Sequence, residues 1–286
     1  MSALRQRLIE DLQVRNYSPR TVEAYVAAVV KLTKHFRKAP DQLTSEELRA
    51  FQVHLLSVKT SWSQFNQIVC GLRFFFGTTL ARPWVVEMLP YGKRPKVLPV
   101  VLSMEEVGQL LAAAKPGRER TLFETAYGCG LRISELLGLQ VTDIDASRMV
   151  VTVRHGKGAK DRQVPLAARL LAALRAWWSV HRHPRWLFPG KTGHLSDGMV
   201  QRVCQRVVQR AGLRKKATLH TLRHSYATHL LEAGVDVVTL QKLLGHSDLS
   251  TTARYLHLST RQMQKLPSVL DLLGLPKEAK KAEGQG

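Results

Sequence analysis

A proline-rich, basic segment at residues 82–101 divides the chain into two parts that each carry helical patterns. This segment, RPWVVEMLPYGKRPKVLPVV, contains four prolines, and Lys93, Arg94 and Lys96 lie close together within it. Proline lacks a backbone N–H and disfavours helix in the residue before it, so one helix cannot run through the segment. We expect a domain at 1–88, a basic linker at 89–101, a second domain at 102–276 and a flexible tail at 277–286.

Helix-start signals dominate the first domain. Ser18 followed by Pro19 places a capping residue before a proline at the first helical position, and Thr44 with Glu47 forms a capping box. Two further helices are expected at 3–14 and 63–76. The pattern therefore predicts an N-terminal four-helix unit.

The second domain combines helices with one short sheet. Residues 149–154 (MVVTVR) and 162–166 (RQVPL) have the composition of strands, and the turn residues HGKGAKD lie between them. This arrangement predicts a β-hairpin. Helices are expected at 120–137, 166–180, 198–211 and 220–233, so the fold class is mainly α with a small antiparallel β-sheet.

The charge balance indicates a polyanionic partner. The 286 residues include 43 Lys and Arg against 22 Asp and Glu, a formal net charge of +21. No apolar run approaches the roughly 20 residues of a membrane span, the N-terminus does not resemble a secretory signal, and three cysteines without a CxxC pair fit a reducing cytoplasm. Because the charge is spread along the chain, we expect DNA rather than a membrane surface as the partner.

Several basic residues are candidates for contacts with the phosphate backbone. Arg202, Arg206 and Arg210 recur every four residues, which places them on one face of a predicted helix. No acidic residue lies among them to pair with their charges, so we expect them to contact phosphates. The full set of expected DNA contacts is Lys93, Arg94, Lys96, Lys160, Arg202, Arg206, Arg210, Arg214, Lys215 and Lys216.

Six residues of the second domain suit attack on a DNA phosphodiester. Arginine binds phosphate oxygens as a planar fork, lysine on a glycine-rich turn can protonate a departing oxygen, histidine moves protons near neutral pH, and tyrosine can be a nucleophile. The six are Arg132, Lys157, His220, Arg223, His246 and Tyr255. The sequence contains neither a carboxylate cluster for two metal ions nor an ATP-binding GxxxxGK[ST] motif, so no cofactor is expected.

Four segments in a fixed order carry a family resemblance. They are GLRISELLGL, HGKGAKDRQVPL, LHTLRHSYATHLLEAG and LLGHSDLSTTARYLH. With them the chain resembles the tyrosine recombinases, also called phage-integrase-type site-specific recombinases. The resemblance spans nearly the whole chain, and residues 8–80 look like the helical core-binding domain of Xer recombinases and of integron or transposon integrases.

The resemblance implies roles for the residues that would bind the phosphate. Arg132 and Arg223 match the two catalytic arginines, which hold the scissile phosphate and stabilise its transition-state charge. His246 matches a position that hydrogen-bonds the phosphate. Glu135 matches an acidic position that supports the active site from behind.

It also implies roles in proton transfer and covalent chemistry. Tyr255 matches the nucleophile, and His220 matches the histidine that assists its deprotonation. Lys157 matches the general acid for the leaving 5′ oxygen. Lys160 lies in the same turn as an alternative, and Lys157 is preferred because the family's lysine lies between two glycines.

The implied reaction proceeds through a 3′-phosphotyrosyl link and a Holliday junction, without metal or ATP. It needs double-stranded DNA with paired inverted half-sites and a tetramer of recombinases on that DNA, with a second recombinase as a possible partner. An apolar segment at 266–275 is expected to be a helix that docks on its own domain or on a neighbouring subunit.

Two other functions remain open from the sequence. A type IB topoisomerase shares the tyrosine chemistry, and a non-catalytic DNA-binding regulator fits the basic charge. Among recombinases, both Xer-type dimer resolution and mobile-element integration fit, and the C-terminal stretch RYLHLSTRQMQKLPSVLDLL slightly favours a mobile element. Either role places the protein in the bacterial cytoplasm, associated with the nucleoid.

Overall fold

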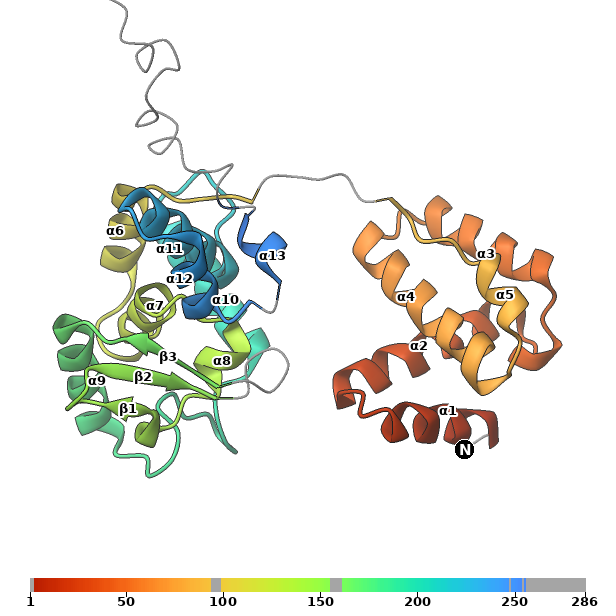
Figure 1. The fold of residues 1–286 in the computed structure, drawn as a ribbon, viewed down its shortest axis with the longest axis horizontal. Coiled ribbons are helices and arrows are strands. Elements are labelled where there is room, and N and C mark those ends of the chain that lie inside the picture. The colour runs from red at the N-terminus through yellow and green to blue at the C-terminus, as the bar shows by residue number, and fades with distance from the viewer. Residues whose placement is uncertain (1–2, 94–98, 155–160, 247, 254, 256–286) are drawn as a thin grey trace, which may run out of the picture. The chain divides into compact units, whose positions relative to one another are not determined.

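The chain consists of two compact units, Met1–Val97 and Leu98–Gly286, each with its own hydrophobic core (Figure 1). The computed structural model describes residues 3–93, 99–154, 161–246, 248–253 and 255. Arg94, Lys96, Lys157 and Lys160 lie outside the described residues, as do the segment 266–275 and the tail 277–286.

The first unit contains the four expected helices. They are α1 (Ala3–Val14), α2 (Pro19–Phe36), α3 (Ser45–Ser57) and α4 (Trp62–Phe74), with a 3₁₀ turn at Pro40–Gln42. Ser18 caps α2, and the capping box of Thr44 and Glu47 opens α3. α4 packs on α2 and continues into a π-helical turn at Phe75–Thr79.

A fifth helix and part of the expected linker also belong to this unit. α5 (Pro83–Glu87) begins at a proline and buries Val85, and Leu89 is fully buried in the same core. The Arg73 guanidinium donates to the carbonyls of Val86 and Leu89, at 2.5 and 2.8 Å. The prediction that 89–101 is linker throughout is therefore wrong at its start, because these contacts hold the chain after α5 on the first core.

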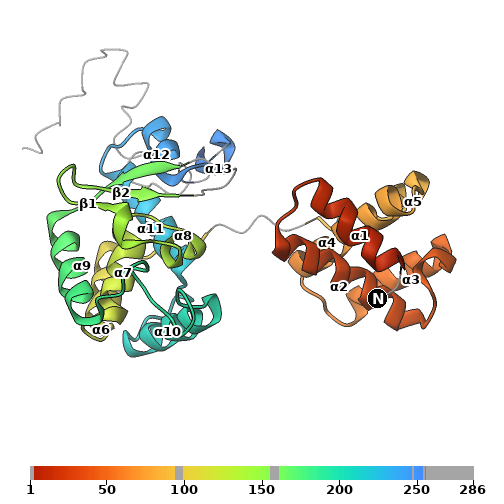
Figure 2. The ribbon, with the colours of Figure 1, turned by 90° about the horizontal axis from the view of Figure 1, so that it is seen from below.

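The second unit is a helical domain with one small sheet. Its chain enters at Leu102, whose buried N–H donates to Ser225 Oγ at 2.9 Å. Its helices are α6 (Met104–Ala113), α7 (Arg118–Gly128), α8 (Ile133–Leu137), α9 (Ala168–His181), α10 (Asp197–Arg210), α11 (Leu219–Glu232), α12 (Val237–Leu244) and α13 (Leu249–Ala253). α7 packs against both α9 and α11 (Figure 2).

The sheet has three antiparallel strands in the order β1-β2-β3. β2 (Val150–Val153) and β3 (Arg162–Pro165) form the expected hairpin, with Val151 opposite Val164. β1 (Ile144–Asp145), preceded by a 3₁₀ turn at Val141–Asp143, adds a strand that the sequence analysis missed. A two-residue strand is too short to show alternation, which is why the pattern gave no signal.

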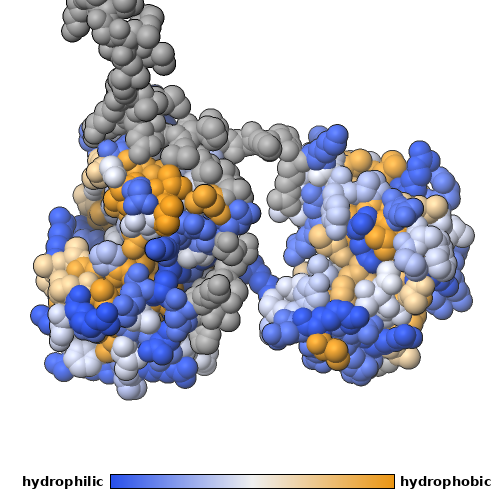
Figure 3. Space-filling model, viewed as in Figure 1, coloured by the Kyte–Doolittle hydropathy of each residue, from blue (hydrophilic) through white to orange (hydrophobic). Residues whose placement is uncertain are grey.

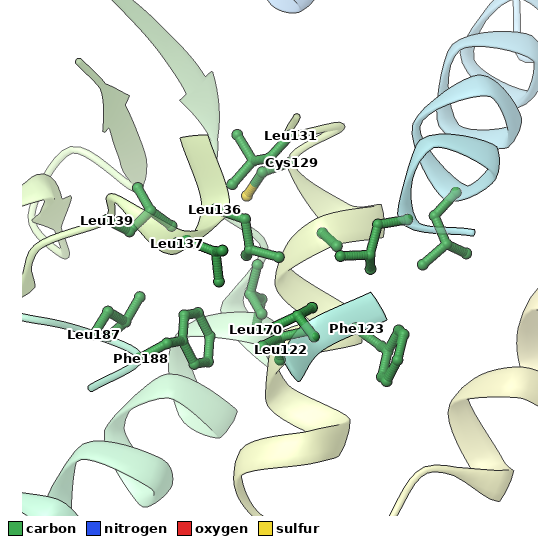
Figure 4. Packing of buried hydrophobic residues seen from close by; sticks show 14 of the residues in the cluster. Leu122, Phe123, Cys129, Leu131, Leu136, Leu137, Leu139, Leu170, Leu187 and Phe188 are labelled. Atoms are coloured by element: carbon green, nitrogen blue, oxygen red, sulfur yellow. The ribbon is translucent and has the colours of Figure 1, made fainter. Parts of the chain in front are cut away.

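Residues 120–137 do not form the single helix that was predicted. α7 ends at Gly128, Gly130 has a left-handed φ of 58°, and α8 starts only at Ile133. Beyond the break, Leu136 and Leu137 pack with Leu122 and Phe188 in the second core (Figure 4). The break lets α8 bury these leucines in a direction that a continuation of α7 does not reach.

The surfaces shown in Figure 3 are mostly hydrophilic, with a hydrophobic area over α12 and the start of α13. Val238 and Leu249 are exposed there, at 53% and 47%. None of the helices in the described part of the chain is long and apolar enough to cross a membrane.

Candidate active site

The loop between α7 and α8 positions Arg132. Arg132 is extended, with φ −70° and ψ 155°, and forms the N-cap of α8 rather than lying within a helix. Its backbone N–H donates to Glu135 Oε2 at 2.9 Å and its guanidinium donates to Glu135 Oε1 at 2.5 Å. This capping geometry turns the arginine side chain toward the residues that follow α12, where it reaches the carbonyl of Gly245 at 3.4 Å.

Glu135 is the buried centre of an arginine cluster. Its side chain is only 5% exposed and it forms ion pairs with Arg132, Arg162 and Arg223. Burial by itself raises the pKa of Glu135, but the hydrogen bonds and charge of Arg162, the Arg132 N–H and the charge of Arg223 together lower it to about 2. Three guanidinium groups around one carboxylate leave a local excess of positive charge, as a phosphate-binding site requires.

Arg223, on α11, is the deepest member of this cluster, with 1% of the residue exposed. Its guanidinium donates to the carbonyls of Gly130 and Leu244, at 2.7 and 2.6 Å. Burial and the neighbouring charge of Arg132 lower the pKa of Arg223 to about 10, so it stays positively charged at neutral pH. The fold therefore holds a fixed cation between α7, α8 and the end of α12.

His246 follows the left-handed C-cap Gly245 of α12 and joins the arginines to the tyrosine. Arg223 Nη2 lies 3.1 Å from His246 Nε2, and an arginine can only donate, so Nε2 is the acceptor. The hydrogen of the neutral ring is then on Nδ1, which donates to Thr252 Oγ1 at 2.8 Å. These two bonds fix both the orientation and the tautomer of the ring.

Tyr255 lies beside His246 within the same chain. It is 3% exposed, and its ring stacks on the His246 ring with centroids 6.3 Å apart and planes 10° apart. The Tyr255 hydroxyl lies 2.8 Å from Nδ1 of His224, on α11. A nucleophile candidate and a cluster of phosphate-binding candidates therefore meet without any contribution from a second chain.

His220 lies one turn before His224 on α11 and is exposed. Their rings contact edge to face, with centroids 4.3 Å apart. His220 and Arg132 also line a pocket of about 500 Å³ together with Ser134, Gln201, Gln205 and Thr218. Five of the six predicted catalytic residues thus lie in or beside one site, and Lys157 is among the residues that are not described.

The expected DNA-contact residues differ in their environment. Lys93 and the α10 residues Arg202 and Arg206 are exposed, as are Arg214 and Lys216.

The expectation that these cations lack acidic partners is wrong for two of them. Arg210 pairs with Glu119 of α7, and Lys215 pairs with Glu106 of α6 at 2.7 Å. The partners come from helices about 90 to 110 positions away in the sequence, so the local pattern gave no sign of them.

Two residues of this site were not predicted from the sequence. Arg162 at the start of β3 binds both carboxylate oxygens of Glu135, at 2.9 and 2.8 Å, and donates from Nε to the Leu243 carbonyl at 2.7 Å. His224 holds the Tyr255 hydroxyl. Its spacing of four from His220 places the two histidines on one helix face, which was an available signal. Within the described residues, no cluster of three or more His, Cys, Asp or Glu side chains could hold a metal ion.

Two protein-family models together match most of the chain. The phage integrase family model matches residues 100–262, and the model of the phage integrase N-terminal SAM-like domain matches residues 4–85. The first match contains every candidate of the arginine, histidine and tyrosine cluster. The second covers α1 to α4.

Similar proteins agree with these models. A putative integrase/recombinase of Sinorhizobium fredii is 44% identical over 280 residues, covering 96% of this chain and 91% of that protein. A tyrosine recombinase XerA of Thermococcus onnurineus is 35% identical over 261 residues, covering 89% and 90%.

Solved structures share the fold. A XerH recombinase bound to a palindromic difH substrate superposes with a TM-score of 0.68 at 22% identity, covering 90% of this chain and 82% of that chain. A lambda integrase from a tetramer bound to a Holliday junction gives a TM-score of 0.73 at 20% identity, covering 88% and 76%. With the family models and the sequence relatives, this likeness shows that the chain belongs to the phage integrase family of tyrosine recombinases.

Proposed function

We propose that this chain is a site-specific DNA recombinase in which Tyr255 attacks the scissile phosphate and forms a 3′-phosphotyrosyl link. The observation that carries the proposal is the stacking of Tyr255 on His246, which shares a hydrogen bond with the buried Arg223. This places the phenol next to fixed positive charge, where a phosphate would be held for attack.

The other site residues have complementary roles in this proposal. Arg132 and Arg223 bind the non-bridging oxygens as planar forks. A phosphate that takes the place of the Arg223–His246 contact would receive a hydrogen bond from His246 once its Nε2 is protonated. Glu135 keeps the guanidinium groups oriented. Lys157 protonates the departing 5′ oxygen. This role is assigned from the family resemblance alone.

The partner is double-stranded DNA with paired inverted half-sites. The similar structures include recombinases bound to difH DNA and a lambda integrase tetramer on a Holliday junction, which supports a tetramer of this chain on its DNA. Lys93 of the first unit is exposed and would contact the phosphate backbone. In the second unit, the exposed residues Arg202, Arg206, Arg214 and Lys216 would do the same. We place this work in the bacterial cytoplasm at the nucleoid.

A covalent-adduct experiment tests the chemistry and identifies the target in one step. Nicked suicide duplexes are made from the DNA flanking its gene and from the replication terminus of the same chromosome. They are mixed with the protein in EDTA, and the reaction is stopped in denaturant. We expect a protein–DNA adduct that survives denaturation and is abolished by Tyr255→Phe. Sequencing the trapped DNA then identifies the recombination site.

The same assay separates the alternatives. Adducts on any supercoiled plasmid, with relaxation and no site preference, would indicate a topoisomerase. Tight site-specific binding with no adduct on any duplex would indicate a regulator. Trapped sites at chromosomal replication termini would support Xer-type resolution, whereas sites at the ends of a mobile element would support integration.

A further inference from the structure

We infer that His224 is the group that accepts the phenolic proton of Tyr255 when the tyrosine attacks DNA. The inference rests on the proposed function, because it assigns one step of that reaction. It assigns the step to a residue other than His220, which the family resemblance associates with deprotonation of the tyrosine.

His224 is within hydrogen-bond distance of the Tyr255 oxygen that reacts. Its Nδ1 lies 2.8 Å from the Tyr255 hydroxyl oxygen, the separation of a direct hydrogen bond. With the ring hydrogen on Nε2, Nδ1 carries a lone pair and accepts the phenolic hydrogen. Proton transfer requires this kind of contact in the attacking geometry.

Burial makes a proton acceptor necessary at this position. Tyr255 is 3% exposed, so bulk water has little access to its hydroxyl. His246, the other histidine at the tyrosine, accepts from Arg223 at Nε2 and donates from Nδ1 to Thr252, so both of its ring nitrogens are engaged. His224 is therefore the better placed of the two to receive the proton.

The step balances as a single displacement. The Tyr255 oxygen forms a bond to phosphorus as the bond from phosphorus to the 5′ oxygen breaks. The phenolic proton passes to His224 Nδ1, giving an imidazolium, and the 5′ oxygen takes a proton from the general acid. In the second step a 5′ hydroxyl attacks the phosphotyrosine and gives its proton to the conjugate base of the general acid. The bond from phosphorus to the Tyr255 oxygen breaks, and the imidazolium returns its proton to the departing phenolate.

The neighbouring His220 places a second, exposed imidazole beside His224. Its ring is 4.3 Å from the His224 ring and is exposed, whereas His224 is half-buried. The charge on a protonated His224 thus develops beside a second imidazole at the surface. His220 then acts through His224, as a positioning residue.

The fold supplies a matched control for a test. His229 lies on the same helix, α11, and its Nδ1 is also 2.8 Å from a tyrosine hydroxyl, that of Tyr127. This pair lies outside the arginine cluster. Asparagine places an amide group near the position of Nδ1, so His224→Asn and His229→Asn each keep a hydrogen-bonding group there while removing the imidazole.

The experiment measures single-turnover cleavage of the suicide duplex recovered in the adduct assay. We expect His224→Asn to cleave about 10²-fold more slowly, the lower end of what a general base contributes, with DNA affinity and thermal midpoint close to those of the unmodified protein. His224→Gln should lose as much, and His229→Asn should cleave within about twofold of the unmodified protein.

Two modified reactants show which proton transfer each variant has lost. A 5′-bridging phosphorothiolate has a thiolate leaving group that needs no proton, so it should restore Lys157→Ala and leave His224→Asn slow. A fluorinated tyrosine at position 255 has a more acidic phenol and should restore much of the His224→Asn rate.

The outcomes separate this inference from the proposed function. Full-rate cleavage by His224→Asn would overturn the role of His224, and so would its rescue by the phosphorothiolate, while abolition by Tyr255→Phe would leave the recombinase assignment intact. An adduct that still forms in the Tyr255→Phe protein would instead overturn the proposed function.

Discussion

At the scale of single residues, the ion pairs of the buried Glu135 carboxylate with three arginines hold the site together. One carboxylate with 5% of its side chain exposed faces three guanidinium groups. Each arginine also donates to a backbone carbonyl, and these carbonyls lie in the last turn of α12, at its C-cap and in the loop after α7. Removing the carboxylate would leave buried cations without compensation, which is more costly than losing one surface ion pair.

We expect Glu135→Gln to lower the free energy of unfolding by about 3 kcal/mol at neutral pH. The lowered pKa of Glu135 means that this stabilisation is present above the unfolded value near 4.5 and is lost as the pH falls toward about 2. Urea denaturation from pH 7 to pH 2.5 should therefore show the difference between the two proteins shrinking in acid.

Glu124→Gln is the matched control. Glu124 pairs at 3.8 Å with Arg169, whose side chain is 89% exposed, so its removal should cost less than about 1 kcal/mol at any pH. A Glu135 variant no less stable than this control would contradict the central role of the carboxylate.

At the scale of elements, the break between α7 and α8 creates the site. Gly130 has a φ of 58°, and its carbonyl accepts from Arg223 at 2.7 Å. A Cβ at this position would lie 2.4 Å from the ring of Tyr226. The same glycine thus allows the chain to turn, brings a carbonyl to the buried arginine and lets α11 approach closely.

Gly130→Ala should destabilise the protein by about 3 kcal/mol, because it forces an alanine into the left-handed region and displaces the Tyr226 ring. It should also slow cleavage, because the positions of Arg132 and Arg223 both depend on this loop. Thermal denaturation and the suicide-duplex assay measure the two effects.

Gly108→Ala serves as the comparison within a helix. Gly108 lies in α6, a Cβ there meets nothing within 4 Å, and the change should raise stability by about 0.5–1 kcal/mol. Equal stability of the two variants would show that the loop tolerates a side chain.

At the scale of the whole molecule, the excess of positive charge is only partly available to DNA. The formal net charge is +21, yet Arg210 and Lys215 already pair with acidic residues of α7 and α6. Arg206, one turn before Arg210, is exposed on the same helix. Neighbouring arginines on α10 should therefore contribute unequally to DNA binding.

We expect Arg206→Gln to reduce the slope of log affinity against log salt concentration by about 1, the loss of one phosphate contact. Arg210→Gln should change the slope less, because its guanidinium is engaged by Glu119. Fluorescence anisotropy on a labelled duplex between 50 and 200 mM salt measures both. Equal slopes for the two variants would show that the ion pair opens on DNA.

The sequence by itself determined the two-domain organisation, the four long N-terminal helices, the hairpin and the family. These features depend on local signals, such as the capping box of Thr44 and Glu47, and on motifs that each lie within one short segment of the chain. Where a helix depends on packing rather than on local periodicity, as in 120–137, the sequence-based prediction was wrong.

Only the tertiary structure decided which residues form ion pairs and hydrogen bonds with one another in the site. Glu135 binds Arg223 and Arg162 across 88 and 27 positions, and His224 reaches Tyr255 across 31. Residues so far apart in sequence leave no spacing that a local pattern could reveal, because their contact is set by how α8, α11 and β3 pack around the core. Local sequence therefore determined the elements and the chemical types of the site, and packing decided the partners of each residue.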